Sequence, residues 1–133
     1  MGGRGSSSGM NNRFSARNFP DLSGSQKQVK WANDIRDSAL DIIEGNIRVN
    51  RDYLRKFRND FDAQVKLDLY EGARETYLKQ LRSVTNAKEI IDRRNAYNPQ
   101  MIVDTVNDRA RQMANQRANG WEYDKKKKRM VKK

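Results

Sequence analysis

Residues 25–43, SQKQVKWANDIRDSALDII, decide how the chain begins to fold. Ser25 and Gln28 stand three positions apart, which is the spacing of a capping box that opens a helix. Apolar residues then recur at three- and four-residue intervals and lay a broad stripe along one side of that helix. The members of the stripe are Val29, Trp31, Ala32, Ile35, Ala39, Ile42 and Ile43. The stripe weakens at Gly45 and Asn46, where we expect the pattern to change.

The next segment carries a second apolar pattern at helical spacing. Its members are Leu54, Phe57, Phe61, Val65 and Leu69. The pattern predicts either a second helix, capped by Asn50, or a continuation of the first. Residues 70–81 predict a third, short helix, although Gly72 lowers helix stability by about 1 kcal/mol relative to alanine. A pair of strands is the alternative for this segment.

Two further helices follow. Ala87, Ile90 and Ile91 indicate a fourth helix that ends before residues 98–99, Asn-Pro. Because asparagine caps helices and proline suits the first helical position, this dipeptide also predicts the start of a fifth helix. Gly120 stands where a left-handed C-terminal cap is expected.

The sequence therefore predicts a mainly α fold with four or five helices around one small core. Residues 22–119 form the helical domain. Residues 1–21 form a flexible Gly/Ser/Arg arm, because its few apolar residues cannot offset the entropy of ordering it. Residues 120–133 form a flexible, basic tail with aromatic residues and lysines. No apolar run is long enough to cross a bilayer, so we expect no membrane contact and a cytoplasmic protein.

The charge of the chain indicates a binding protein rather than an enzyme. Net charge is +11, and residues 120–133 hold seven basic and two acidic side chains. Dense cationic segments bind phosphate chains by releasing condensed counterions. The chain has no histidine and no cysteine, which excludes histidine-based triads, thiolate nucleophiles and thiolate metal sites. We expect no catalytic residue and no cofactor.

Four acids form a ribbon along the first helix. Asp34, Asp37, Asp41 and Glu44 are separated by three, four and three positions, so they share one helical face. At 1.5 Å per residue the ribbon extends over about 15 Å, and its carboxylates cannot all reach one ion. We expect no metal site here, and interpret the ribbon as a solvated or partner-facing surface.

Four arginines continue the same spacing. Arg48, Arg51, Arg55 and Arg58 form a basic stripe if one helix spans the region. Guanidinium groups match phosphate oxygens in geometry, so the stripe is a candidate nucleic-acid contact. The alternative is a solvated face whose arginines pair with neighbouring acids. The acids in question are Asp52, Asp60 and Asp62.

The tail combines aromatic and cationic side chains. Trp121 and Tyr123 either stack on nucleobases or pack the tail onto the body. The cationic candidates are Lys125, Lys126, Lys127, Lys128 and Arg129, which would contact phosphates or an acidic protein groove, or only increase solubility. We expect the other tryptophan, Trp31, to lie in the core, and the alternative is an exposed stacking platform.

Residues 22–36 resemble a module, L-x-G-S-x-K-Q-x-x-W-A-x-x-I-R, of small proteins from phages and mobile elements of Gram-positive bacteria. All nine defined positions match. A second segment of those proteins, A-x-x-W-I-x-x-R, is matched by Ala87, Ile91 and Arg94, while Ile90 replaces its aromatic residue. The resemblance implies a phage or mobile-element accessory protein in the cytoplasm of a bacterial host cell.

Small basic proteins of that setting include anti-CRISPR proteins, which inhibit host effector nucleases by binding. The resemblance and the charge together suggest a partner that is nucleic acid or a host nucleoprotein complex such as a CRISPR effector. Two alternatives are a virion or packaging assembly protein with a DNA-contacting tail, and a small RNA- or ribosome-associated protein. The sequence leaves the oligomeric state open.

Overall fold

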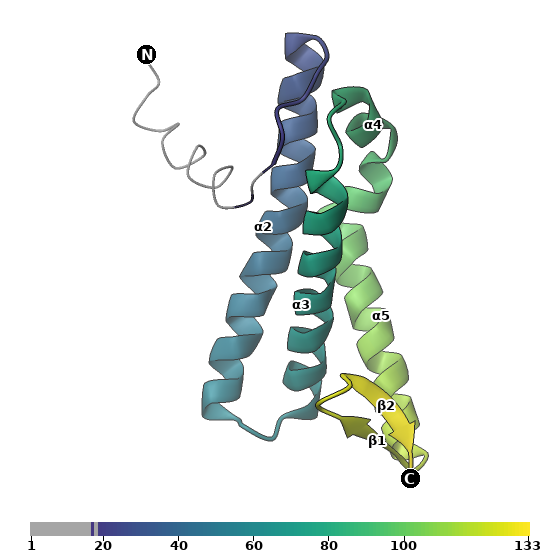
Figure 1. The fold of residues 1–133 in the computed structure, drawn as a ribbon. Helices are drawn as coiled ribbons and strands as arrows, with labels where there is room; N and C mark the ends of the chain where they lie inside the picture. The colour runs from purple at the N-terminus through teal and green to yellow at the C-terminus, as the bar shows by residue number, and fades with distance from the viewer. Residues whose placement is uncertain (1–16, 18) are drawn as a thin grey trace.

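The computed structural model describes Arg17 and residues 19–133 of the chain, and these form a mainly helical fold. Three long helices, α2 (Gln26–Lys56), α3 (Phe61–Arg82) and α5 (Pro99–Ala118), pack against one another and alternate in direction (Figure 1). The short helix α4 (Ala87–Asp92) and the 3-10 helix η1 (Arg94–Tyr97) lie beside the first half of α2. The mainly α prediction is confirmed, with four α-helices in this part of the chain.

Helix α2 is one continuous helix of 31 residues. The predicted capping box is present, since the Ser25 and Gln28 side chains each accept a hydrogen bond from the other's backbone N–H. Asn50 does not cap a new helix, because its amide group donates to the Asn46 carbonyl inside α2. Buried Ile43 and Ile47 lie on either side of the weak point in the pattern and hold the helix together through it.

Helix α3 contains part of the second apolar pattern and the whole of the predicted third helix. Asp60 caps it by accepting a hydrogen bond from the Ala63 N–H, so the second apolar pattern is divided between α2 and α3. Residues 70–81 belong to the same helix, which shows that the strand alternative was wrong. Gly72 is exposed within it, and its cost of about 1 kcal/mol is small beside the burial of Tyr70, Leu78 and Leu81.

The boundaries of α5 are as predicted. The Asn98 side chain accepts hydrogen bonds from the backbone N–H groups of Gln100 and Met101, and Pro99 takes the first helical position. Gly120 has φ +93°, a left-handed conformation that glycine adopts without strain. This turn directs the chain from α5 into the C-terminal segment.

That segment is a β-hairpin and not the flexible tail that we predicted. Strands β1 (Trp121–Asp124) and β2 (Arg129–Lys132) pair antiparallel, with Tyr123 opposite Met130 and Asp124 opposite Arg129. The lysine-rich composition misled the prediction, because four of the lysines, residues 125–128, form the hairpin loop and a short strand lies on either side of them. Met130 is 8% exposed and anchors the hairpin on the helices.

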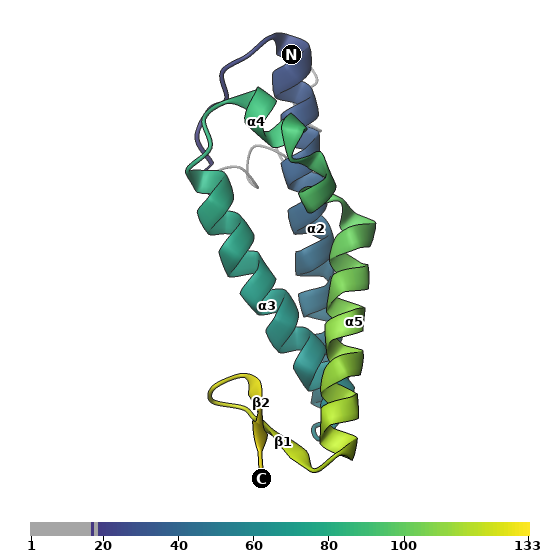
Figure 2. The same ribbon diagram turned by 90° about the vertical axis from the view of Figure 1, so that its right-hand side faces the viewer.

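The apolar interior consists of two clusters where we expected one core. The larger cluster joins α2, α3, α4 and α5 around Leu40, Ile43, Leu81 and Ile90. The smaller cluster lies at the hairpin end, where Val65, Ala110 and Met113 pack against Met130. Its rim is formed by Phe61, Leu69, Trp121 and Tyr123. The hairpin therefore packs at the end of the bundle where α3 begins and α5 ends, as Figure 2 shows.

The prediction that Trp31 lies in the core is wrong. It is 48% exposed, and the Arg94 guanidinium lies 5.5 Å from its ring centroid. Its neighbour Ala32 points into the core, and a helix turns by about 100° per residue, so Trp31 falls on the flank of the apolar stripe.

The predicted N-terminal arm lies mostly outside the described residues. Of residues 1–21, the structure describes Arg17 and residues 19–21. In the part that the structure describes, no helix combines the length and the apolar character needed to cross a membrane.

Candidate nucleic-acid interface

The hairpin end of the molecule carries a hollow of about 480 Å³ lined by aromatic and cationic side chains. We call it the aromatic hollow. Its aromatic members are Phe61, Trp121 and Tyr123, and its cationic members are Arg58, Arg117, Lys125 and Lys133. They come from the α2–α3 turn, the start of α3, the end of α5 and the hairpin, which meet at this end (Figures 1 and 2). Two stretches that are distant in sequence, residues 58–64 and 117–133, thus build one surface.

Tyr123 is fixed as a wall of the hollow. Its hydroxyl donates a hydrogen bond of 2.6 Å to Asp68 Oδ2, and Gln64 Nε2 donates to both oxygens of the same carboxylate. Its ring meets Phe61 edge to face, with the centroids 6.1 Å apart. Burial, followed by the hydrogen bond to Asp68, raises the pKa of Tyr123 well above its usual value. Tyr123 therefore stays protonated and packs the hairpin onto α3.

The cations of the hollow are available to a ligand. Within the described residues, none of the four has an acidic partner within ion-pair distance. Arg117 lies 4.6 Å above the Phe61 ring centroid, a cation–π arrangement that holds its guanidinium at the rim. The hollow also contains two acids, Asp60 and Glu122, so its cations exceed its acids by two. The carboxylate of Asp60 is already engaged as the cap of α3.

The hairpin loop presents its lysines to solvent. Lys125, Lys126, Lys127 and Lys128 are all exposed, as is Arg129 at the base of the loop. Asp124 shapes the loop, because its carboxylate accepts hydrogen bonds from the backbone N–H groups of residues 126 and 127. These bonds, with the nearby cationic side chains, lower the pKa of Asp124. An ionised Asp124 thus keeps four consecutive lysines in one defined turn.

The predicted arginine stripe is divided among three places. Arg58 lies beyond the end of α2 and joins the aromatic hollow. Arg48 and Arg51 line a second hollow, between α2 and α3, together with Lys128 from the hairpin loop. Arg51 pairs with Glu71 of α3 at 3.1 Å. Arg55 lines neither hollow.

The solvated-face alternative holds for one of these arginines. Arg55 pairs with Asp52 at 3.3 Å, and both side chains are exposed. The other two proposed acidic partners are used elsewhere, since Asp60 caps α3 and Asp62 pairs with Lys66 at 2.9 Å. Arg48 has no ion pair among the described residues, which leaves it available to a ligand.

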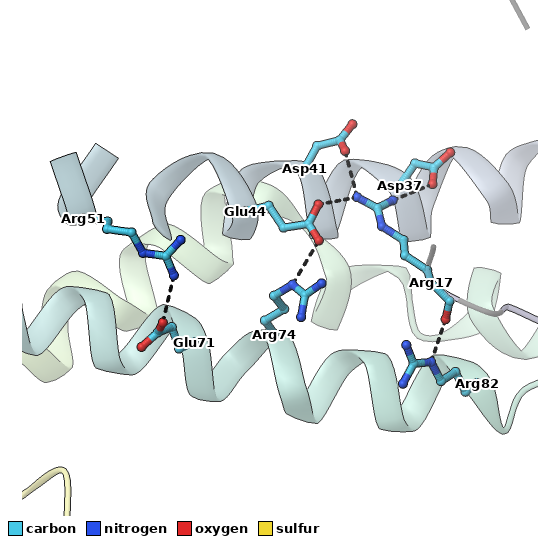
Figure 3. Close-up of polar contacts among 8 residues, drawn as sticks. All are labelled: Arg17, Asp37, Asp41, Glu44, Arg51, Glu71, Arg74 and Arg82. Carbon is cyan, nitrogen blue, oxygen red and sulfur yellow. Dashed lines mark hydrogen bonds and ion pairs between the residues drawn. The ribbon is translucent and has the colours of Figure 1, made fainter. Parts of the chain in front are cut away.

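The acidic ribbon has a role that the sequence did not indicate, because it holds Arg17 (Figure 3). The guanidinium of Arg17 contacts Asp37 at 3.0 Å, Asp41 at 3.1 Å and Glu44 at 2.6 Å, and its side chain is 4% exposed. Burial lowers the pKa of Arg17, but its hydrogen bonds to Glu44 and Asp41 outweigh burial and leave the pKa raised. The ribbon therefore anchors the segment that precedes α2.

Two arginines of α3 complete this network. Arg82 Nε donates to the Arg17 carbonyl oxygen at 2.6 Å, and Arg74 pairs with Glu44 at 3.0 Å (Figure 3). The remaining acid of the ribbon, Asp34, pairs with Lys30. Within the described residues no group of carboxylates is arranged to hold a metal ion. Only the spacing of the acids was visible in the sequence, and nothing in it identified Arg17 as their partner.

Comparison with protein-family models, with curated proteins and with solved structures finds no match to this chain. The function is therefore inferred from the side chains described above. Cations without acidic partners gather around aromatic rings at the hairpin end, and this combination of groups binds nucleic acid in many folds.

Proposed function

We propose that this protein binds nucleic acid, or the nucleic-acid path of a nucleoprotein complex, through its hairpin end and without catalysis. The observation that carries the proposal is the aromatic hollow next to the exposed lysine loop. Guanidinium and ammonium groups contact phosphates, while Trp121 offers an aromatic surface between them. A net charge of +11 would speed association with any polyanion.

The resemblance of residues 22–36 to phage and mobile-element proteins extends the proposal. In that setting the nucleoprotein would be a host CRISPR effector in the bacterial cytoplasm. The protein would inhibit it by occupying a channel that otherwise holds nucleic acid. Stoichiometric binding suffices for such inhibition, and no chemical step is required of the inhibitor.

The test is a comparison of two variants with the same change in charge. The loop variant replaces Lys125, Lys126, Lys127 and Lys128 by glutamine. The control variant replaces four exposed lysines at the opposite end of the bundle by glutamine: Lys27, Lys30, Lys79 and Lys88. Two of these control lysines form exposed ion pairs, which contribute at most about 1 kcal/mol each to stability.

Affinity for a fluorescent 15-nucleotide DNA is measured between 50 and 200 mM salt. Each phosphate contact contributes about 0.7 to the slope of log K against log salt for a single strand. The magnitude of this slope should therefore fall by up to about 3 in the loop variant and stay unchanged in the control variant. Equal losses in the two variants would show that net charge alone drives binding, and would contradict a site at the hairpin end.

A second candidate function is assembly, and one surface favours it. Val49 and Tyr53 on α2 and Phe57 at its C-cap follow one another at four-residue intervals and are 64%, 45% and 52% exposed. The rings of Tyr53 and Phe57 lie with centroids 4.6 Å apart, so they present a joint apolar surface. A second copy of the chain, placing the same stripe against this one, would bury it. Light scattering tests this candidate, because a monomer at high protein concentration would eliminate it.

A further inference from the structure

We infer that the aromatic hollow receives an unpaired nucleobase, so that the protein selects single-stranded nucleic acid over duplex. The inference rests on the proposed function, and it specifies which form of nucleic acid is bound. It follows from the arrangement of Trp121, Phe61 and the cations around them.

The hollow has a rigid interior. Trp121 is half-buried and packs against the smaller apolar cluster, in which Met130 and Met113 are buried. The hydrogen bond from Tyr123 to Asp68 ties the middle of β1 to α3. A base that enters would therefore meet a preformed aromatic surface, which lowers the entropic cost of binding. The volume of about 480 Å³ lies within the range of small-molecule sites.

Phosphate-binding groups surround this surface on different elements. Arg58 follows α2, Arg117 belongs to the last turn of α5, and Lys125 begins the hairpin loop. A strand that inserts one base has its phosphates on both sides of that base. Cations placed around the rim can therefore contact the backbone while the ring is inside the hollow.

A duplex cannot use the hollow in this way. Each base of a duplex is stacked on both faces and paired at its edge, so its ring reaches an aromatic pocket only after unpairing, at a cost of a few kcal/mol. The loop lysines would still attract duplex phosphates, because that attraction needs no base. The aromatic hollow therefore separates single strands from duplexes, whereas the lysine loop does not.

The test uses three probes of 15 nucleotides: a single-stranded DNA, its duplex, and an abasic single strand with the same phosphates. Wild-type protein should bind the normal single strand about 10-fold more tightly than the abasic strand, because stacking on an aromatic ring contributes about that factor per base. The duplex should bind more weakly than the normal single strand. These comparisons need no variant, so they do not depend on any variant's folding.

Two variants locate the effect. Trp31→Phe leaves Trp121 as the only tryptophan, and the normal strand should quench its fluorescence while the abasic strand does not. Trp121→Leu keeps an apolar side chain against Met130. Its affinity for the normal strand should fall about 10-fold, while its affinity for the abasic strand should change little. Thermal melting followed by circular dichroism verifies that the leucine variant is folded.

Equal binding of normal and abasic strands, or a duplex bound as tightly as the single strand, would overturn the inference and leave the proposed function standing. Absence of Trp121 quenching by a bound strand would overturn it as well. Failure to bind all three probes at 50 mM salt would overturn the proposed function itself.

Discussion

Replacement of Tyr123 by phenylalanine tests how the hairpin is held on the helices. The change removes the hydroxyl that donates to Asp68 and keeps the ring against Phe61. A hydrogen bond to a charged group contributes about 1.5–3 kcal/mol to stability. Gln64 remains as a donor to Asp68, and Tyr123 is only half-buried, so both effects reduce the loss. We expect a decrease of about 1.5 kcal/mol in the free energy of unfolding.

The pH dependence of this decrease follows from the raised pKa of Tyr123. Because the folded state disfavours the phenolate, the stabilisation is fully present below the unfolded pKa of about 10 and is lost as the pH rises above it. The difference between wild type and Tyr123→Phe should therefore be constant from pH 7 to 9. At pH 11 it should be smaller by about 1 kcal/mol.

Urea unfolding at pH 8 and pH 11, followed by circular dichroism, measures both quantities. Tyr53→Phe is the matched control, since Tyr53 is 45% exposed and its hydroxyl has no hydrogen-bond partner in the described part of the chain. The control should match wild type at both pH values. A Tyr123→Phe variant as stable as wild type at pH 8, or a difference that does not shrink at pH 11, would refute the assigned contact.

Two further changes test the packing of each end. Arg17→Gln should lower the free energy of unfolding in urea by about 2 kcal/mol, because it removes a buried cation from Asp37. The other two acids, Asp41 and Glu44, are more exposed and keep contact with water, which limits the loss. A loss below about 0.5 kcal/mol would contradict the role of the acidic ribbon as the anchor of Arg17. Met130→Ala should lower the free energy of unfolding by about 2–3 kcal/mol. It should also abolish hydrogen-exchange protection in the hairpin while α4 stays protected. Equal loss of protection in α4 would contradict the division of the interior into two clusters.

Local signals in the sequence predicted where α2 and α5 begin, but not where α2 ends or α3 begins. The Ser25–Gln28 capping box and the cap at residues 98–99 involve residues one to three positions apart, so the sequence contains both partners of each contact. The sequence does not determine the length of α2, because that length depends on contacts with residues far away in the chain. Whether a helix continues through Gly45 depends on Ile43 and Ile47, whose burial is decided by other helices.

Contacts between distant residues could not be predicted. The hairpin depends on Met130 reaching Met113 and Ala110, whereas the composition of residues 125–133 indicates only charge. Arg17 reaches acids that lie 20 to 27 positions further along the chain. The sequence predicted which residue types form the candidate site, but not which of them lie together. Arg58 and Trp121 line one hollow only when the helices and the hairpin pack against one another.

The central claim is that nucleic acid binds at the hairpin end, and a nuclear magnetic resonance titration of isotope-labelled protein with a 15-nucleotide single strand tests it most directly. Chemical-shift changes in backbone amides should concentrate in residues 58–64 and 117–133, with α4 and the first half of α2 unchanged. Shift changes concentrated around α4, or none at low salt with the strand in excess, would contradict the claim.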